Sequence, residues 1–173
     1  KSEIINSNSQ IYDIKGNIEF KNVSYTYPNT GIKALENLSF KVNSGETLAI
    51  MGKTGSGKST IALLLCRLID PTEGEILIDG KNLKEHNLEN YRKFIGYIPQ
   101  ESYLFSDTIE NNIGFAIDHP SEEKIIEFAN KADVHKNIVE FKDQYKTMVG
   151  ERGVMLSGGQ KQRICIARAL IKE

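Results

Sequence analysis

The sequence predicts an α/β fold in which a parallel-sheet core carries an antiparallel β subdomain and an α-helical subdomain. Alternating apolar residues before residue 43 predict antiparallel strands, and the apolar run "TLAIM" at 47–51 predicts a strand covered on both faces. Helical periodicity dominates from Ser106 onward. The 173 residues fit one domain, and a formal net charge of −1 gives no global field for nucleic acid or anionic lipid. Any recognition of phosphate must therefore be local.

Four further segments are expected to form or extend the sheets. "IEFKNVSYTY" at 18–27 alternates in two phases, which predicts a strand with a bulge or bend. "LENLSFKV" at 35–42 alternates cleanly, so these two segments are expected to pair antiparallel. "GEILIDG" at 74–80 and "FIGYIP" at 94–99 are expected as short strands.

Helices are expected after the first glycine-rich loop and throughout the later part of the chain. Apolar residues spaced as on one helix face predict a helix from about Lys58 until Pro71 stops it. Ser121 and Asp133 are each expected to cap a helix of a helical insert. The cysteines are expected to be reduced core thiols and the histidines exposed side chains: Cys66, Cys165, His86, His119 and His135.

The stretch "GKTGSGKS" at 52–59 fits the P-loop pattern G-x-x-x-x-G-K-[ST], between a predicted strand and a predicted helix as the motif requires. Its glycines let successive N–H groups point at phosphate oxygens, and the helix N-terminus adds partial positive charge. Lys58 would bridge the β- and γ-phosphates, and Ser59 would supply a hydroxyl ligand for Mg²⁺. The expected phosphate-binding set is Gly52, Lys53, Thr54, Gly55, Ser56, Gly57, Lys58, Ser59 and Thr60.

A second glycine-rich stretch, "LSGGQKQR" at 156–163, follows about a hundred residues later. Ser157 can act as the N-cap of a helix, which leaves Gly158 and Gly159 as bare backbone donors at its positive end. "LSGGQ" is expected by chance in only about one such chain in several thousand. The second loop is therefore a candidate anion site without a lysine.

With both motifs, the chain from about Gly16 to its end resembles the nucleotide-binding domain of ATP-binding-cassette transporters, whose signature sequence is "LSGGQ". The resemblance implies a P-loop NTPase core with a RecA-like parallel sheet, ATP and Mg²⁺ as cofactors, and ATP hydrolysis coupled to solute export. It also implies a head-to-tail pair with a second nucleotide-binding domain, identical or different. In that pair each signature, here Ser157, Gly158, Gly159 and Gln160, presses on the γ-phosphate held by the other domain.

Further positions match the family. Tyr27 in "YTYP" corresponds to the aromatic that stacks on adenine, and Gln100 to the glutamine that reaches Mg²⁺ and the attacking water. The resemblance thus implies Lys58 and Gln100 as catalytic residues and Ser59 and Gln100 as metal ligands. "TMVGERG" at 147–153, together with "SDTIENNI", resembles the exporter-type subgroup, in which this stretch contacts the membrane domains.

The expected organisation is a linker at 1–15 from a preceding membrane region, followed by an ATP-binding domain at 16–173. Within it we expect the β subdomain and P-loop core at 16–99, the glutamine loop and helical subdomain at 100–156, and the signature helix at 157–173. In the family an apolar strand ending in Asp-Glu comes next, and its glutamate activates water. These 173 residues stop before that strand, so we expect them to bind Mg·ATP but to hydrolyse it negligibly alone. The resemblance places the domain on the cytoplasmic side of the cell membrane, within an integral membrane transporter.

Other functions are weighed against this one. DNA-repair and chromosome-organising ATPases place a very long coiled coil between related loops, and the neutral charge also disfavours nucleic acid. A soluble, non-transport cassette ATPase would need a second cassette. A regulatory module that binds nucleotide without hydrolysing it would be separated from a motor by the sequence beyond Glu173.

Overall fold

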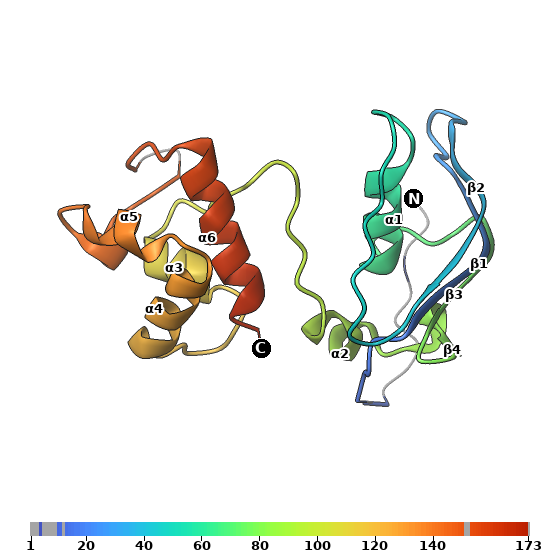
Figure 1. Ribbon diagram of the computed structural model, residues 1–173, viewed down its shortest axis with the longest axis horizontal. Helices are drawn as coiled ribbons and strands as arrows, with labels where there is room; N and C mark the ends of the chain where they lie inside the picture. Colours follow the sequence, from blue (N-terminus) through green and yellow to red (C-terminus); the bar gives the residue numbers. More distant parts are fainter. Residues whose placement is uncertain (1–3, 5–9, 12, 151–152, 173) are drawn as a thin grey trace. The chain divides into compact units, whose positions relative to one another are not determined.

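The computed structural model describes residues 4, 10–11, 13–150 and 153–172. Parts of the predicted linker (1–3, 5–9 and 12) and of the predicted exporter-type stretch (151–152), with residue 173, lie outside the described residues. The chain forms two compact units, Lys1–Ile95 and Gly96–Glu173. Figure 1 shows that the strands belong to the first unit and the helices α3 to α6 to the second.

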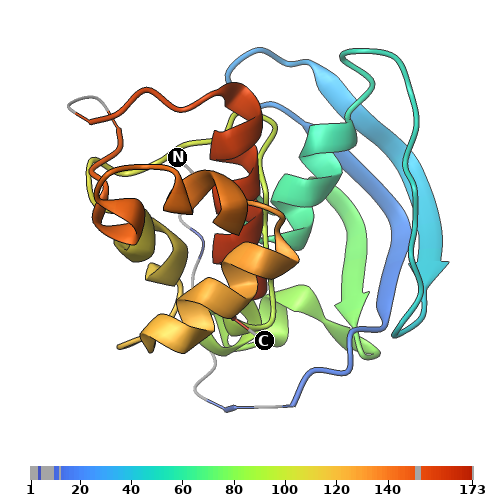
Figure 2. The same ribbon diagram turned by 60° about the vertical axis from the view of Figure 1, so that its left-hand side comes forward.

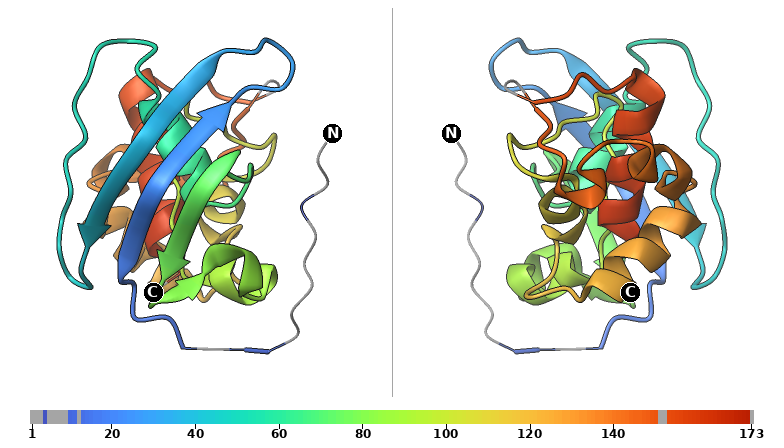
Figure 3. Two further views of the ribbon diagram at one scale, coloured as in Figure 1. Left: turned by 90° about the vertical axis from the view of Figure 1, so that its right-hand side faces the viewer. Right: turned by 90° about the vertical axis from the view of Figure 1, so that its left-hand side faces the viewer.

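The first unit is built on a four-stranded sheet in the order β2-β1-β3-β4. The strands are β1 (Ile18–Thr26), β2 (Lys33–Val42), β3 (Glu73–Ile78) and β4 (Lys81–Asn82), and every neighbouring pair is antiparallel. The left view of Figure 3 shows β1 lying between β2 and β3. The register of β1 with both neighbours shifts around Asn22, whose φ is 49°. The predicted bulge and antiparallel pair are therefore confirmed.

Helix α1 (Lys58–Leu65) covers one face of this sheet, as Figure 2 shows. The 3₁₀ helix η1 (Leu83–Glu85) and helix α2 (Leu88–Lys93) complete the unit. Burial of each large apolar side chain contributes roughly 1.5–3 kcal/mol, so this shared core holds the start of α1 against the sheet. The core contains Phe20, Val23, Tyr25, Leu35, Ile61, Leu64, Ile76, Ile78, Leu83 and Tyr91.

The two segments predicted as additional sheet strands, 47–51 and 94–99, are not strands in the structure, so these two predictions are wrong. Most of their apolar side chains are exposed instead; Met51 is 92% and Phe94 52% accessible. A strand exists only through hydrogen bonds to a neighbouring strand, and neither segment has such a partner among the described residues. The apolar pattern indicates a preference for burial but does not supply the partner.

Helix α1 ends at Leu65 instead of continuing to Pro71. Arg67 follows the C-cap in the left-handed conformation, with a φ of 47°. Its N–H donates to the Leu64 carbonyl, and the Leu68 N–H donates to the Leu63 carbonyl, both at 2.9 Å. These two bonds form a Schellman motif, so a backbone cap and not the proline stops the helix.

The second unit is helical: α3 (Ile109–Gly114), α4 (Glu122–Lys131), α5 (His135–Val139), the 3₁₀ helix η2 (Gln144–Lys146) and α6 (Gly158–Leu170). Helix α6 contacts both α3 and α4 (Figure 2). The Ser121 hydroxyl accepts a hydrogen bond from the Lys124 N–H at 3.3 Å, so the predicted cap of α4 is confirmed. In the part of the chain that the structure describes, no helix is long and apolar enough to span a bilayer. The buried core of the unit contains Leu104, Ile109, Ile113, Ile125, Phe128, Ala129, Ala132, Val134, Ile138, Tyr145, Val149, Leu156, Ile164, Cys165, Ala167 and Ile171.

Asp133 does not cap α5 as predicted; the residue at that N-cap position is Val134. Asp133 has a φ of 52° and ends α4, because its N–H donates to the Asn130 carbonyl and the Val134 N–H donates to the Ala129 carbonyl, each at 2.9 Å. Aspartate is favoured at an N-cap and is also tolerated in the left-handed conformation. The local pattern could not separate these two uses.

The burial of the cysteine and histidine side chains agrees only partly with the predictions. Both thiols are free and buried, as predicted. His119 is exposed as predicted, and His135 is half-buried. His86 is only 4% exposed, with Nε2 3.2 Å from the Ile78 carbonyl oxygen, so its predicted surface position is wrong. Polar neighbours in sequence do not report which residues pack over a side chain.

Candidate functional site

The first glycine-rich loop leads directly into α1, and two of its glycines are required by the backbone. Gly55 and Gly57 have φ values of 82° and 85°, a region that other residues rarely adopt. A Cβ on Gly57 would overlap the Ala34 carbonyl oxygen and lie 2.8 Å from Leu35 Cδ2. The loop is therefore packed closely against β2, and only glycine fits at the N-cap of α1.

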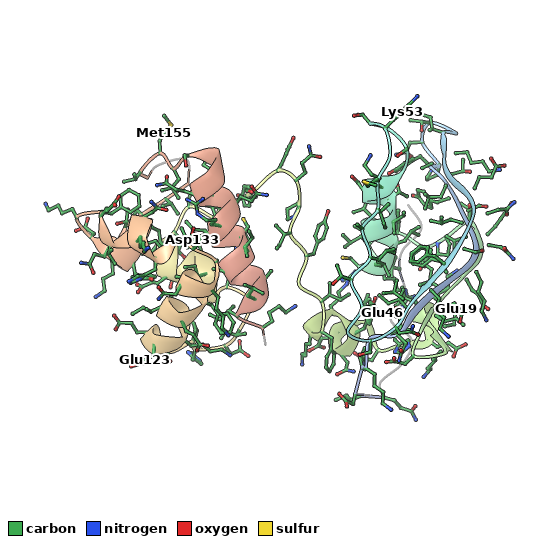
Figure 4. The ribbon with its side chains drawn as sticks, viewed as in Figure 1. Glu19, Glu46, Lys53, Glu123, Asp133 and Met155 are labelled. Atoms are coloured by element: carbon green, nitrogen blue, oxygen red, sulfur yellow. The ribbon has the colours of Figure 1, made fainter. Side chains whose placement is uncertain are left out.

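The ammonium group of Lys58 lies inside the loop. Its Nζ donates to the carbonyl oxygens of Gly52 and Lys53, each at 2.7 Å, and lies 3.5 Å from Ser56 Oγ. By contrast, the Lys53 side chain projects from the tip of the loop (Figure 4). The loop thus holds one cation at its centre, with all three N–H donors directed at oxygen atoms.

The N-cap of α1 is Gly57, which has no side chain that could cap the first N–H groups of the helix. Its N-cap makes no side-chain hydrogen bond, and its first turn contains no acidic residue. The first N–H groups of a helix have no partner within the helix, and they carry about half a positive charge in total. With Lys58 beside them, these donors fit a chain of phosphate groups. The exposed Ser59 hydroxyl fits the single protein ligand that Mg²⁺ often takes when phosphates and waters supply the rest.

Tyr27, 33 residues before Thr60, is brought to this loop by the fold. Its hydroxyl lies 3.1 Å from Thr60 Oγ1, and Thr60 is 3% exposed in the first turn of α1. The Tyr27 ring meets the Tyr25 ring edge-on, with centroids 5.0 Å apart. Burial raises the pKa of Tyr25, and the nearby Tyr27 adds to this shift. An aromatic ring therefore lies next to the first turn of α1, directly after the glycine-rich loop.

The second glycine-rich stretch begins α6. Ser157 is its N-cap, as predicted, and its Oγ accepts a hydrogen bond from the Gln160 N–H at 3.2 Å. Gln160 Oε1 accepts in return from the Ser157 N–H at 2.9 Å. Gly158 and Gly159 are exposed, and within the described residues neither N–H donates a hydrogen bond. The capping role of Gln160 was missed, although Ser followed three residues later by Gln is its known signal.

Gln100 is exposed and lies in a bend of the second unit, the unit that also contains the signature residues. The segment after it is held by two residues that the motifs did not reveal. Asn112, fully buried, accepts from the Phe105 N–H at 2.9 Å, and Arg168 donates to the Tyr103 carbonyl at 3.0 Å. These contacts attach the chain beyond Gln100 to α3 and α6. The P-loop and Tyr27 belong to the first unit.

Comparisons with known proteins agree on one family. A family model described as ABC transporter matches residues 35–173. ABC transporter B family member 6 of Dictyostelium discoideum is 44% identical over 174 residues, which cover 96% of this chain and 26% of that protein. Human ATP-binding cassette sub-family B member 5 is 46% identical over 160 residues, 92% of this chain and 13% of that protein.

The fold comparison gives the same result. The solved structure of a bacterial Atm1-family ABC exporter with ATP bound matches with a TM-score of 0.90 and 41% identity, over 96% of this chain and 30% of that one. This match confirms the predicted α/β P-loop fold class, although the sheet of the described residues is antiparallel throughout. The chain spans less than a third of the length of each of these relatives. Since the family model covers most of the chain and both motifs have the expected local structure, the chain belongs to the ABC transporter family.

Proposed function

We propose that this chain is the ATP-binding motor domain of an ABC exporter, which couples ATP binding and hydrolysis to solute export across a membrane. The observation that carries this proposal is the loop around Lys58. The ammonium group of Lys58 donates to carbonyl oxygens of a glycine-rich loop, next to a helix start without a side-chain cap. Membership of the ABC transporter family supports the transport function. The match to an exporter with ATP bound supports export and the choice of nucleotide.

In this proposal the loop holds the phosphates of ATP. The N–H groups of the loop and of the first turn of α1 donate to phosphate oxygens, and Lys58 exchanges its carbonyl partners for β- and γ-phosphate oxygens. Bound Mg²⁺ would neutralise part of the phosphate charge, with Ser59 and Gln100 as its protein ligands. The phosphate-binding residues are Gly52, Lys53, Thr54, Gly55, Ser56, Gly57, Lys58, Ser59 and Thr60.

One residue is assigned to the adenine base and two are assigned to the reaction. Tyr27 supplies the aromatic face on which adenine stacks, an interaction that typically contributes roughly 1–3 kcal/mol for a nucleic-acid base. Gln100 orients the attacking water, and Lys58 stabilises the negative charge that develops during phosphoryl transfer. Lys58 and Gln100 are thus the proposed catalytic residues of this chain.

The signature residues are proposed to act on a nucleotide held by a second domain. The N–H groups of Gly158 and Gly159 stand at the positive end of α6, while Ser157 and Gln160 fix the backbone that presents them. A second nucleotide-binding domain, identical or different, is therefore a proposed partner, together with the transmembrane domains of the transporter. The proposed location is the cytoplasmic side of the membrane, with residues 1–15 as the linker and 16–173 as the ATP-binding domain.

Isothermal titration calorimetry with the 173-residue chain tests nucleotide binding. ATP, ADP and AMP are titrated with Mg²⁺ and again with a chelator present. Because the site is built around phosphates and a cation, we expect affinity to fall from ATP to ADP to AMP and to weaken when Mg²⁺ is removed. Equal affinity for ATP and AMP would contradict the proposal, since the loop would then not be the main binding element.

A further inference from the structure

The backbone of Tyr27 is fixed by the turn between β1 and β2. Its N–H donates to the Ile32 carbonyl at 2.9 Å, and its own carbonyl accepts from the N–H groups of Gly31 at 2.8 Å and Thr30 at 3.3 Å. These bonds set the direction in which the Tyr27 side chain leaves the chain. Only its two side-chain torsions are then left to be decided.

Two contacts restrict those torsions. The ring of Tyr25, which is 6% exposed and belongs to the core of the first unit, meets the Tyr27 ring at 86°. At the other end, the Tyr27 hydroxyl lies 3.1 Å from Thr60 Oγ1. A buried hydroxyl that loses its partner is costly, so Thr60 favours the ring position that keeps this bond. Tyr27 itself is only half-buried, so part of its ring stays accessible.

We propose that Thr60 is a positioning residue for Tyr27: its hydroxyl holds the tyrosine ring in the orientation that receives adenine. The inference rests on the proposed nucleotide-binding function. Thr60 belongs to the helix whose N-terminus would hold the phosphates, so one hydrogen bond joins the base platform to the phosphate loop. The ring and the loop then keep a constant separation, matched to a ligand that carries both a base and phosphates.

This role predicts a base-dependent effect. Tyr27→Phe keeps the ring and removes only the bond to Thr60, so the ring loses its orientation but not its stacking face. A single neutral hydrogen bond corresponds to roughly a fivefold change in affinity. We therefore expect Tyr27→Phe to weaken Mg·ATP binding about fivefold and to leave the binding of inorganic tripolyphosphate, which has no base, unchanged.

The decisive experiment is a double-mutant cycle measured by calorimetry on the 173-residue chain, with Mg·ATP and with Mg·tripolyphosphate. Tyr27→Phe, Thr60→Val and the double variant are compared with wild type. Because the two hydroxyls share one bond, the double variant is expected to bind ATP no more weakly than the weaker single variant. Thr60→Ser keeps a hydroxyl and is expected to restore affinity.

Tyr103→Phe, at a tyrosine that is 65% exposed in the second unit, is the matched control and should bind ATP like wild type. Circular dichroism melting reports whether each variant folds. If Thr60→Val does not fold, Tyr27→Phe and Thr60→Ser still test the inference. Wild-type affinity of Tyr27→Phe would overturn the inference, as would single effects that multiply in the double variant. If the wild-type chain binds neither ligand, the proposed function fails instead.

Discussion

The two glycine-rich helix starts look alike in sequence but differ in structure. Helix α1 starts without a side-chain cap, whereas α6 starts with a reciprocal capping box between Ser157 and Gln160. Neither first turn contains an acidic residue, although α2, α3 and α4 each carry a glutamate there. Both N-termini are therefore suited to an anion, and α1 adds a cation, Lys58, whose ammonium group donates to carbonyl oxygens of its own loop.

The glycines of the two loops also serve different purposes. Gly57 has a φ of 85° and would clash with β2 if it carried a side chain. A Cβ on Gly158 would meet nothing within 4 Å, and one on Gly159 would meet only Arg163 Nη1 at 3.6 Å. In the loop before α1, glycine allows a positive φ and a close approach to β2. At the start of α6, glycine leaves the backbone N–H groups uncovered by a side chain. The comparison shows that similar composition does not imply the same binding site.

The largest expected effect is a difference in the free energy of unfolding between alanine variants of Gly57 and Gly158. Gly57→Ala combines positive-φ strain with a clash against β2, so we expect it to lower the free energy of unfolding by about 2–4 kcal/mol. Gly158→Ala is the matched control and should stay within about 0.5 kcal/mol of wild type, because its Cβ enters open space. Urea denaturation followed by circular dichroism measures both. Equal losses would show that the two loops do not differ in this way.

Removing the cation of the first loop is expected to have the next largest effect. Lys58→Ala should weaken Mg·ATP binding roughly 10- to 150-fold, since a charged hydrogen bond contributes about 1.5–3 kcal/mol. Lys84→Ala removes the same charge from an exposed position in η1 and should leave the Kd unchanged. Calorimetry gives both values. Indistinguishable Kd values for the two variants would argue that the ammonium inside the loop does not meet phosphate.

The capping box of α6 can be broken with little change in bulk. Ser157→Ala removes the acceptor of the Gln160 N–H, so we expect a loss of about 1 kcal/mol and faster hydrogen exchange at the Gln160 amide. Ser121→Ala removes the equivalent cap of α4 and should speed exchange at Lys124 instead. Unchanged exchange at Gln160 would mean that its cap contributes nothing in solution.

The smallest expected effect has the opposite sign. Gly159→Ala should stabilise α6 by about 0.5 kcal/mol, because alanine favours the helix and its methyl group meets only one flexible atom. Under the proposed function the same methyl group hinders access to the backbone, so ATP-dependent association of two domains should weaken. Urea denaturation and sedimentation of the variant report the two properties. A destabilised variant would contradict the view that glycine here serves access and not shape.

Most of the candidate site could be predicted from local patterns. The P-loop pattern at 52–59 and the N-cap at Ser157 depend on residues within a few positions of one another, and the structure shows the expected loop and cap. The proposed roles of Tyr27 and Gln100 came only from the family resemblance, because a strand-end tyrosine and a loop glutamine have no distinctive pattern alone. Arg168 and the buried Asn112 that it contacts were missed because Tyr103 and Asn112 lie 65 and 56 residues before Arg168 in sequence.

The sequence by itself determined both glycine-rich loops, the helices that follow them and the pairing of β1 with β2, because periodicity, caps and turn residues act over short distances. The tertiary structure decided that His86 is buried and that the segments at 47–51 and 94–99 do not form strands among the described residues. It also decided that the Tyr27 hydroxyl meets Thr60. Each of these depends on which distant groups are available to pack or to accept a hydrogen bond, and no local pattern contains that information.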